Sequence, residues 1–170
     1  MIRQKGDAMK RIFFDLDGTL AEWKEADMRE LKSKGYFLNL NPQKEILDFA
    51  RRLANKEKFE VYILSAFLTD CTALEDKNKW CDMKAPEIKN RNFVLNGTNK
   101  ALSVMKILQK ESLTDEDILV DDYSKNLNEW KKYGGKAIKW LNGKNGRGIK
   151  FDGPRTGNVN ELARLISFAA

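Results

Sequence analysis

Two acidic residues, Asp15 and Asp17, follow an apolar run and stand directly before a glycine, in the stretch Phe13-Phe14-Asp15-Leu16-Asp17-Gly18-Thr19-Leu20. Residues i and i+2 of an extended chain project to the same side, so both carboxylates can face one pocket at the end of a strand. Such a pair suits phosphate chemistry, because one carboxylate can attack phosphorus while the other moves protons. Two acids in one pocket repel each other unless a cation compensates, which favours an oxygen-ligated ion such as Mg2+.

Two other interpretations of this stretch compete with phosphate chemistry. An Asp-Gly pair is a common turn in its own right. A calcium loop of the EF-hand type fits less well, because it requires a third acid two residues beyond Asp17 and a glutamate at its twelfth position. The chain has Thr19 and Ala26 at those positions.

The residue types that are missing restrict the mechanism. The chain contains no histidine, which excludes phosphohistidine chemistry, a Ser-His-Asp triad and a histidine-ligated metal. Cys71 and Cys81 match no zinc-binding spacing, and we expect both to be reduced thiols on one helix from Thr69 or Asp70 to about Lys84. Acid-base catalysis must then come from carboxylates, lysines or tyrosines.

Length and composition predict a single domain spanning residues 1–170. The chain is 42% hydrophobic and 33% charged, a balance typical of a soluble globular protein. At 170 residues it is too short for two full domains. No stretch is long and apolar enough for a membrane span or a signal peptide, so we expect a cytoplasmic protein that does not bind membranes. The sequence defines no oligomeric state.

The charge balance bears on the partners of the protein. Lysine and arginine (31) exceed aspartate and glutamate (25), which gives a net charge of +6. This excess helps to attract a phosphorylated substrate and is compatible with nucleic acid. Because the basic residues are scattered along the chain, nucleic acid is the less favoured partner.

Hydrophobic patterns predict strands that alternate with helices. The alternation indicates right-handed crossovers and a parallel sheet covered on both faces, which is an α/β, Rossmann-like doubly wound fold. We expect the strands at residues 10–14, 59–64, 92–95, 117–120 and 136–140, and the helices at residues 22–34, 42–55, 69–84, 101–110, 124–133 and from 158 or 160 onward. The glycine-rich segment 141–157 is predicted to be an irregular crossing, because it lacks the Gly-Lys-Ser/Thr signature of a phosphate loop.

Ligands of such sheets bind at the carboxyl ends of the strands, and polar residues follow the predicted second and third strands there. Ser65 and the neighbouring Ala66 can offer a hydroxyl and backbone amides to a phosphate oxygen, and Lys100 can neutralise a transferring phosphoryl group. A serine that ends a strand is also a common turn residue, and most lone lysines are solvated.

Two further acids, Asp121 and Asp122, follow the predicted fourth strand directly. Adjacent carboxylates at a strand end need an attractor, and Mg2+ shared with Asp15 would serve. The competing interpretation is an acid pair placed before a helix that begins near Ser124, where the helix dipole favours negative charge.

These four groups, in this order, resemble the four motifs of the haloacid dehalogenase (HAD) superfamily. The resemblance implies a phosphotransferase in which Asp15 is the phosphorylated nucleophile and Asp17 is the general acid and base. Within the superfamily, residues 10–146 resemble the 5'(3')-deoxyribonucleotidases, especially the short bacterial and phage-type members. The segments that carry this likeness are Gly35–Pro42, Lys79-Trp80, Asn96–Lys100, Asp121–Trp130, Gly134-Gly135 and Leu141–Gly143.

The family resemblance also implies a cap and a substrate. Residues 21–41 would form a small helical cap inserted after the first strand, with Phe37 as a candidate for stacking on the base or sugar. The substrate would be a nucleoside monophosphate. The chain departs from better characterised members in having Tyr123 where arginine is common and Ser65-Ala66 where a Thr-Ser pair is common.

The sequence thus predicts a Mg2+-dependent phosphomonoesterase that dephosphorylates deoxyribonucleotides through an aspartyl-phosphate. Mg2+ would be held by Asp15, by Asp121 or Asp122, and by the backbone carbonyl of Asp17. An alternative enzyme would act on nucleic-acid 3'-phosphates or on small phosphorylated metabolites at the same site. A basic, non-catalytic nucleic-acid-binding protein on a HAD scaffold is the remaining alternative.

Overall fold

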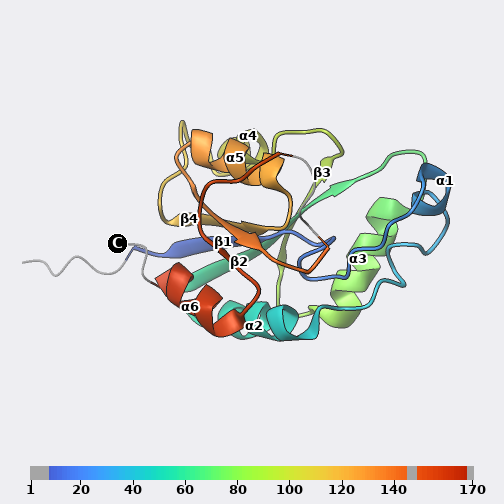
Figure 1. Cartoon of the computed structure of the whole chain (residues 1–170), viewed down its shortest axis with the longest axis horizontal. Helices are drawn as coiled ribbons and strands as arrows, with labels where there is room; N and C mark the ends of the chain where they lie inside the picture. The colour runs from blue at the N-terminus through green and yellow to red at the C-terminus, as the bar shows by residue number, and fades with distance from the viewer. Residues whose placement is uncertain (1–7, 145–148, 168–170) are drawn as a thin grey trace, which may run out of the picture.

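The computed structural model describes residues 8–144 and 149–167. Its centre is a six-stranded, all-parallel sheet in the order β3-β2-β1-β4-β5-β6 (Figure 1), which confirms the predicted Rossmann-like fold. The strands are β1 (Lys10–Phe14), β2 (Phe59–Phe67), β3 (Asn90–Leu95), β4 (Asp117–Asp121), β5 (Lys136–Trp140) and β6 (Arg155–Thr156).

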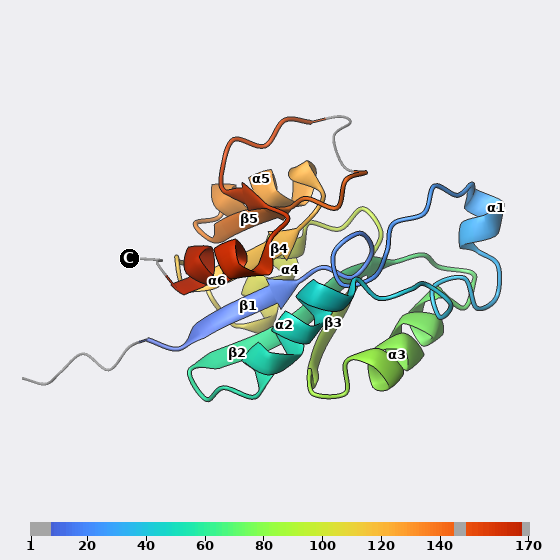
Figure 2. The same cartoon turned by 60° about the horizontal axis from the view of Figure 1, so that its bottom comes forward.

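Helices cover both faces of the sheet. α2 (Lys44–Ala54) and α6 (Val159–Ser167) lie on one face, and α4 (Lys100–Ile107) and α5 (Ser124–Lys132) lie on the other (Figures 1 and 2). α3 (Ala73–Lys84) contributes to the same hydrophobic core as α2 and α6. Among residues 8–144 and 149–167, no helix combines the length and apolar composition needed to cross a bilayer.

The alternation of β1 explains the two cores. Ile12 and Phe14 point into the core on the α2 side, whereas Phe13 points into the core on the α5 side. The Phe13 ring stands 5.1 Å from the ring of Trp130 on α5. Each fully buried side chain of this size contributes roughly 1.5–3 kcal/mol, so β1 is held firmly between the layers.

The helix predicted at residues 22–34 is wrong for most of its length. Only α1 (Met28–Leu31) is helical, and none of its residues is buried. Its Met28 and the nearby Trp23 are exposed. A helix this short gains little without a packed face, so most of the expected cap at residues 21–41 is irregular.

Smaller differences concern segment boundaries. α3 begins at Ala73, not at residue 69 or 70, so Cys71 lies before the helix, and both cysteines are free, as predicted. The crossing at 141–157 contains the two-residue strand β6, which pairs with β5. Residues 145–148 of that crossing lie outside the described residues, as do residues 1–7 and 168–170 of the predicted domain.

Candidate active site

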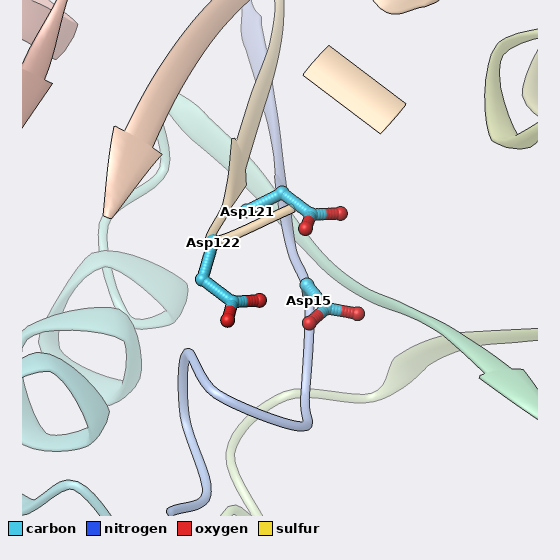
Figure 3. A group of neighbouring side chains, drawn as sticks. All are labelled: Asp15, Asp121 and Asp122. Carbon is cyan, nitrogen blue, oxygen red and sulfur yellow. The ribbon is translucent and has the colours of Figure 1, made fainter. Parts of the chain in front are cut away.

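Three carboxylates meet at the point where the strand order reverses. β1 is hydrogen-bonded to β2 on one side and to β4 on the other, and ligands of such sheets bind at this switch point. Asp15 follows β1, and Asp121 and Asp122 stand at the end of β4, as Figure 3 shows. One carboxylate oxygen from each of these three residues lies within 4.8 Å of the others.

Lys100 provides a buried positive charge beside this cluster. Asn99 caps α4 by accepting a hydrogen bond from the backbone N–H of Leu102, so Lys100 is the first residue of the helix. Its Nζ lies 2.6 Å from Asp15 Oδ1 and 2.8 Å from Asp121 Oδ2. Burial favours the neutral amine, but the charges of Asp121 and Asp15 outweigh burial and raise the pKa of Lys100 above its ordinary value.

The three acids repel one another despite this ammonium. Burial and the charge of Asp121 raise the pKa of Asp15 to about 7, against the opposing effect of Lys100. Burial and the charges of Asp15 and Asp121 raise the pKa of Asp122 to about 8. A cluster of oxygen donors with such raised pKa values fits a hard divalent cation, which would favour the ionised carboxylates.

Asp122 packs against the turn that follows the first aspartates. Gly18 has a φ of +88°, and a Cβ at this position would lie 2.3 Å from Asp122 Oδ2. The Asn142 amide donates to the Gly18 carbonyl at 2.8 Å and to Asp122 Oδ2 at 3.1 Å. The close approach therefore requires glycine at position 18, and Asn142 ties the turn to the second acidic pair.

Replacing Gly18 by alanine is expected to raise the Mg2+ concentration for half-maximal activity by about 10- to 100-fold, the range for disturbing groups that orient metal ligands. The added methyl would displace the Asp122 carboxylate as well as strain the backbone. Gly97→Ala is the matched control, because Gly97 also has a positive φ, of +86°, but open space around its Cβ position. Equal Mg2+ dependence of the two variants, measured in phosphate-release assays, would contradict this role of Gly18.

Asp17 points to a different partner, Lys77 on α3. The Lys77 ammonium donates to Asp17 Oδ2, to Ser65 Oγ at 3.1 Å and to the Ala66 carbonyl at 2.5 Å. The other carboxylate oxygen, Asp17 Oδ1, is buried and has no hydrogen-bond partner among the described residues. Thus Asp17 does not belong to the cluster of three acids, and Lys77 holds one of its carboxylate oxygens.

Sequence reasoning missed Lys77 and did not single out Asn142 as a site residue. α3 is rich in charged residues, of which Lys77 is one. One signal was present, because Ala73, Lys77, Trp80 and Cys81 follow helical spacing and all four are buried. Asn142 stands in a glycine-rich crossing without periodicity, where the only sign was its place in a segment that resembles the deoxyribonucleotidases.

The acidic cluster, Asp17 and Lys100 line one pocket of about 1180 Å3. The lining residues with chemical roles in our predictions are Asp15, Asp17, Ala66, Lys100, Asp121 and Asp122. Two exposed aromatic side chains, Trp23 and Tyr123, also line the pocket. The pocket thus brings carboxylates and an ammonium together, with two exposed aromatic side chains in the same lining.

Two residues predicted to bind substrate lie outside the pocket lining. Ser65 is fully buried, and its hydroxyl accepts the hydrogen bond from Lys77. Phe37 is 7% exposed and packs in the core, with Lys77 Nζ 4.5 Å from its ring centroid. Their roles in binding phosphate and base stay predictions.

The fold is shared with solved hydrolases of low sequence identity. A D,D-heptose 1.7-bisphosphate phosphatase from B. bronchiseptica, complexed with magnesium and phosphate, is 15% identical with a TM-score of 0.69, over 95% of this chain and 100% of that one. A haloacid dehalogenase-like hydrolase from Xanthomonas campestris is 11% identical with a TM-score of 0.64, over 96% and 99% of the two chains. A HAD-family enzyme from Bacteroides thetaiotaomicron, complexed with magnesium and inorganic phosphate, is 13% identical with a TM-score of 0.56, over 81% and 96%.

Sequence comparison identifies the family. No curated protein sequence matches the chain significantly. The family model described as "5' nucleotidase, deoxy (Pyrimidine), cytosolic type C protein" matches residues 19–169, which is most of the chain. With the shared fold and the predicted motifs, this match confirms a nucleotidase-like phosphatase of the HAD superfamily, and the chain belongs to the cytosolic type C 5' nucleotidase family.

Proposed function

We propose that the protein is a Mg2+-dependent 5'(3')-deoxyribonucleotidase that hydrolyses nucleoside monophosphates through an aspartyl-phosphate. The observation that carries this proposal is the shared pocket of Asp15, Asp17, Lys100 and the Asp121-Asp122 pair at the switch point of the sheet. The family match supports a nucleotide as the substrate.

Asp15, Asp121 and Asp122 would hold Mg2+, together with the backbone carbonyl of Asp17. The donor set supports this assignment, because all the ligands are oxygens and the three side chains already converge. When bound, Mg2+ would neutralise negative charge on the phosphoryl oxygens. Lys100 would contribute a second positive charge, since its ammonium has only two acceptors among the described residues and lines the pocket.

Asp15 would act as the nucleophile, and Asp17 as the general acid and base. A carboxylate oxygen of Asp15 forms a bond to phosphorus as the ester P–O bond breaks, and the leaving alkoxide takes a proton from Asp17. Asp17, now ionised, removes a proton from the water that attacks the aspartyl-phosphate. Release of phosphate restores the Asp15 carboxylate and the protonated Asp17. The place of Asp17 in the pocket lining beside Asp15 supports this role.

Replacing Asp17 by asparagine is expected to lower kcat for thymidine 5'-monophosphate by about 10²- to 10⁴-fold, the usual contribution of general acid-base catalysis. Both steps would slow, because the amide neither protonates the alkoxide nor activates water. Rapid acid quenching would then measure the fraction of phosphorylated enzyme. A variant that turns over at the wild-type rate would contradict the acid-base assignment.

The pocket also leaves room for larger phosphomonoesters. Its volume of about 1180 Å3 exceeds the roughly 300–1,000 Å3 of typical small-molecule sites, which keeps nucleic-acid 3'-phosphates as an alternative substrate class. Phosphate release from thymidine 5'-monophosphate, uridine 5'-monophosphate, glycerol 3-phosphate and a 3'-phosphorylated deoxyoligonucleotide distinguishes the classes. The proposal expects the highest kcat/KM for thymidine 5'-monophosphate. A higher value for the oligonucleotide would favour the alternative, and equal low values for all four would reject the nucleotidase assignment.

A further inference from the structure

Side chains on one face of α3 form hydrogen bonds with the irregular segment that precedes α2. The Asp76 carboxylate accepts hydrogen bonds from the Gly35 backbone N–H and the Thr72 hydroxyl, both at 3.0 Å. The Trp80 indole donates to the Leu40 carbonyl at 2.8 Å. Asp76, Lys77 and Trp80 are all buried, so the residues on either side of Lys77 in this face are themselves held in place.

The hydrogen-bonding capacity of Lys77 is already filled. A lysine ammonium has three N–H donors, and the three acceptors of Lys77 are Asp17, Ser65 and the Ala66 carbonyl. Its side chain is 1% exposed and does not belong to the pocket lining. Lys77 therefore differs from Lys100, which lines the pocket, and is poorly placed to donate to a phosphate.

We propose that Lys77 is a positioning residue that holds the Asp17 carboxylate in the orientation required for proton transfer. It binds Oδ2 of Asp17, which lines the pocket, while Ser65 and Ala66 at the end of β2 hold the ammonium itself. The inference rests on the proposed role of Asp17. It assigns Lys77 to the proton transfer and not to binding of the phosphoryl group.

Two substrates distinguish a role in proton transfer from a role in phosphoryl binding, because their leaving groups differ in how much they need to be protonated. The alkoxide that leaves thymidine 5'-monophosphate must be protonated, whereas the nitrophenolate of p-nitrophenyl phosphate departs readily without a proton. Lys77→Met is expected to lower kcat/KM for thymidine 5'-monophosphate by about 100-fold, as misplacement of a catalytic group does. For p-nitrophenyl phosphate, kcat/KM should change little, because it reports only steps up to the loss of the leaving group.

Lys79→Met is the matched control, since Lys79 lies on the same helix and pairs with Glu75 on the exposed surface. It should leave both substrates unaffected. If Lys77→Met does not fold, as judged by circular dichroism, Lys77→Gln provides the same comparison, because it retains amide donors but no charge for Asp17. Equal losses for both substrates would overturn the positioning role and indicate phosphate binding or a general structural role.

A double-mutant cycle closes the test. If Lys77 acts through Asp17, adding Lys77→Met to Asp17→Asn should cause no further loss of kcat/KM for thymidine 5'-monophosphate. A further loss as large as in the wild-type background would overturn the inference while leaving the nucleotidase proposal intact. No phosphate release by the wild-type protein from either substrate would reject the proposed function, and the role of Lys77 with it.

Discussion

Replacing Asp15 by asparagine is expected to lower phosphate release by about 10⁵-fold or more, as removal of a covalent nucleophile does in other enzymes. The amide has nearly the shape of the carboxylate but cannot form the acyl-phosphate bond. Since the folded protein raises the pKa of Asp15 to about 7, it disfavours the charge at this position. A neutral amide should therefore not destabilise the fold.

The assay is steady-state phosphate release from thymidine 5'-monophosphate, with thermal unfolding measured on the same samples. Asp115→Asn is the control, because Asp115 is exposed and does not belong to the pocket lining. It should match the wild-type rate. Near-wild-type turnover by Asp15→Asn would remove Asp15 from the mechanism, whereas lost turnover together with a lost unfolding transition would assign it a structural role instead.

Removal of Mg2+ by a chelator is expected to abolish turnover, and added Mg2+ should restore it. Asp15, Asp121 and Asp122 offer converging oxygens and repel one another without a cation. Binding to the folded state alone also stabilises it, by about 2.7 kcal/mol when the free ion exceeds its Kd 100-fold. Mg2+ should therefore raise the unfolding temperature as well as the activity.

Two comparisons make the metal test specific. Asp122→Asn should lose most of the Mg2+-dependent rise in unfolding temperature, because one of the three converging carboxylates is neutralised. Asp115→Asn should keep it. Full turnover of the wild-type protein in excess chelator, or the same thermal shift in Asp122→Asn, would contradict a metal site at these residues.

The fold followed from the sequence because strands and helices alternate with strong local patterns. β5 has the predicted bounds, and α2 lies within the helix predicted at residues 42–55 and buries Ile46, Leu47, Phe49, Ala50 and Leu53. The segment around Trp23 and Met28 was predicted wrongly, because helix-forming residues there lack a face to bury. Propensity alone does not hold a helix in water.

Local patterns likewise predicted some residues of the site and not others. Asp15, Asp17, Lys100, Asp121 and Asp122 could be brought together from sequence, because the carboxyl ends of parallel strands lie along one edge. Contacts between side chains and distant loops carry no such signal. Lys77 meets Asp17 across 60 positions of the chain, and Asn142 meets Gly18 across 124. These partners depend on tertiary packing, which no local pattern encodes.

Capture of the phosphorylated enzyme is the most direct test of aspartyl-phosphate chemistry. Wild-type protein and Asp17→Asn would be mixed with radiolabelled thymidine 5'-monophosphate and Mg2+, quenched in acid within milliseconds and digested. We expect a hydroxylamine-sensitive label on the peptide that contains Asp15, with more label on Asp17→Asn if hydrolysis is slowed more than phosphorylation. A label on another residue, or rapid phosphate release with no label on either protein, would contradict the mechanism.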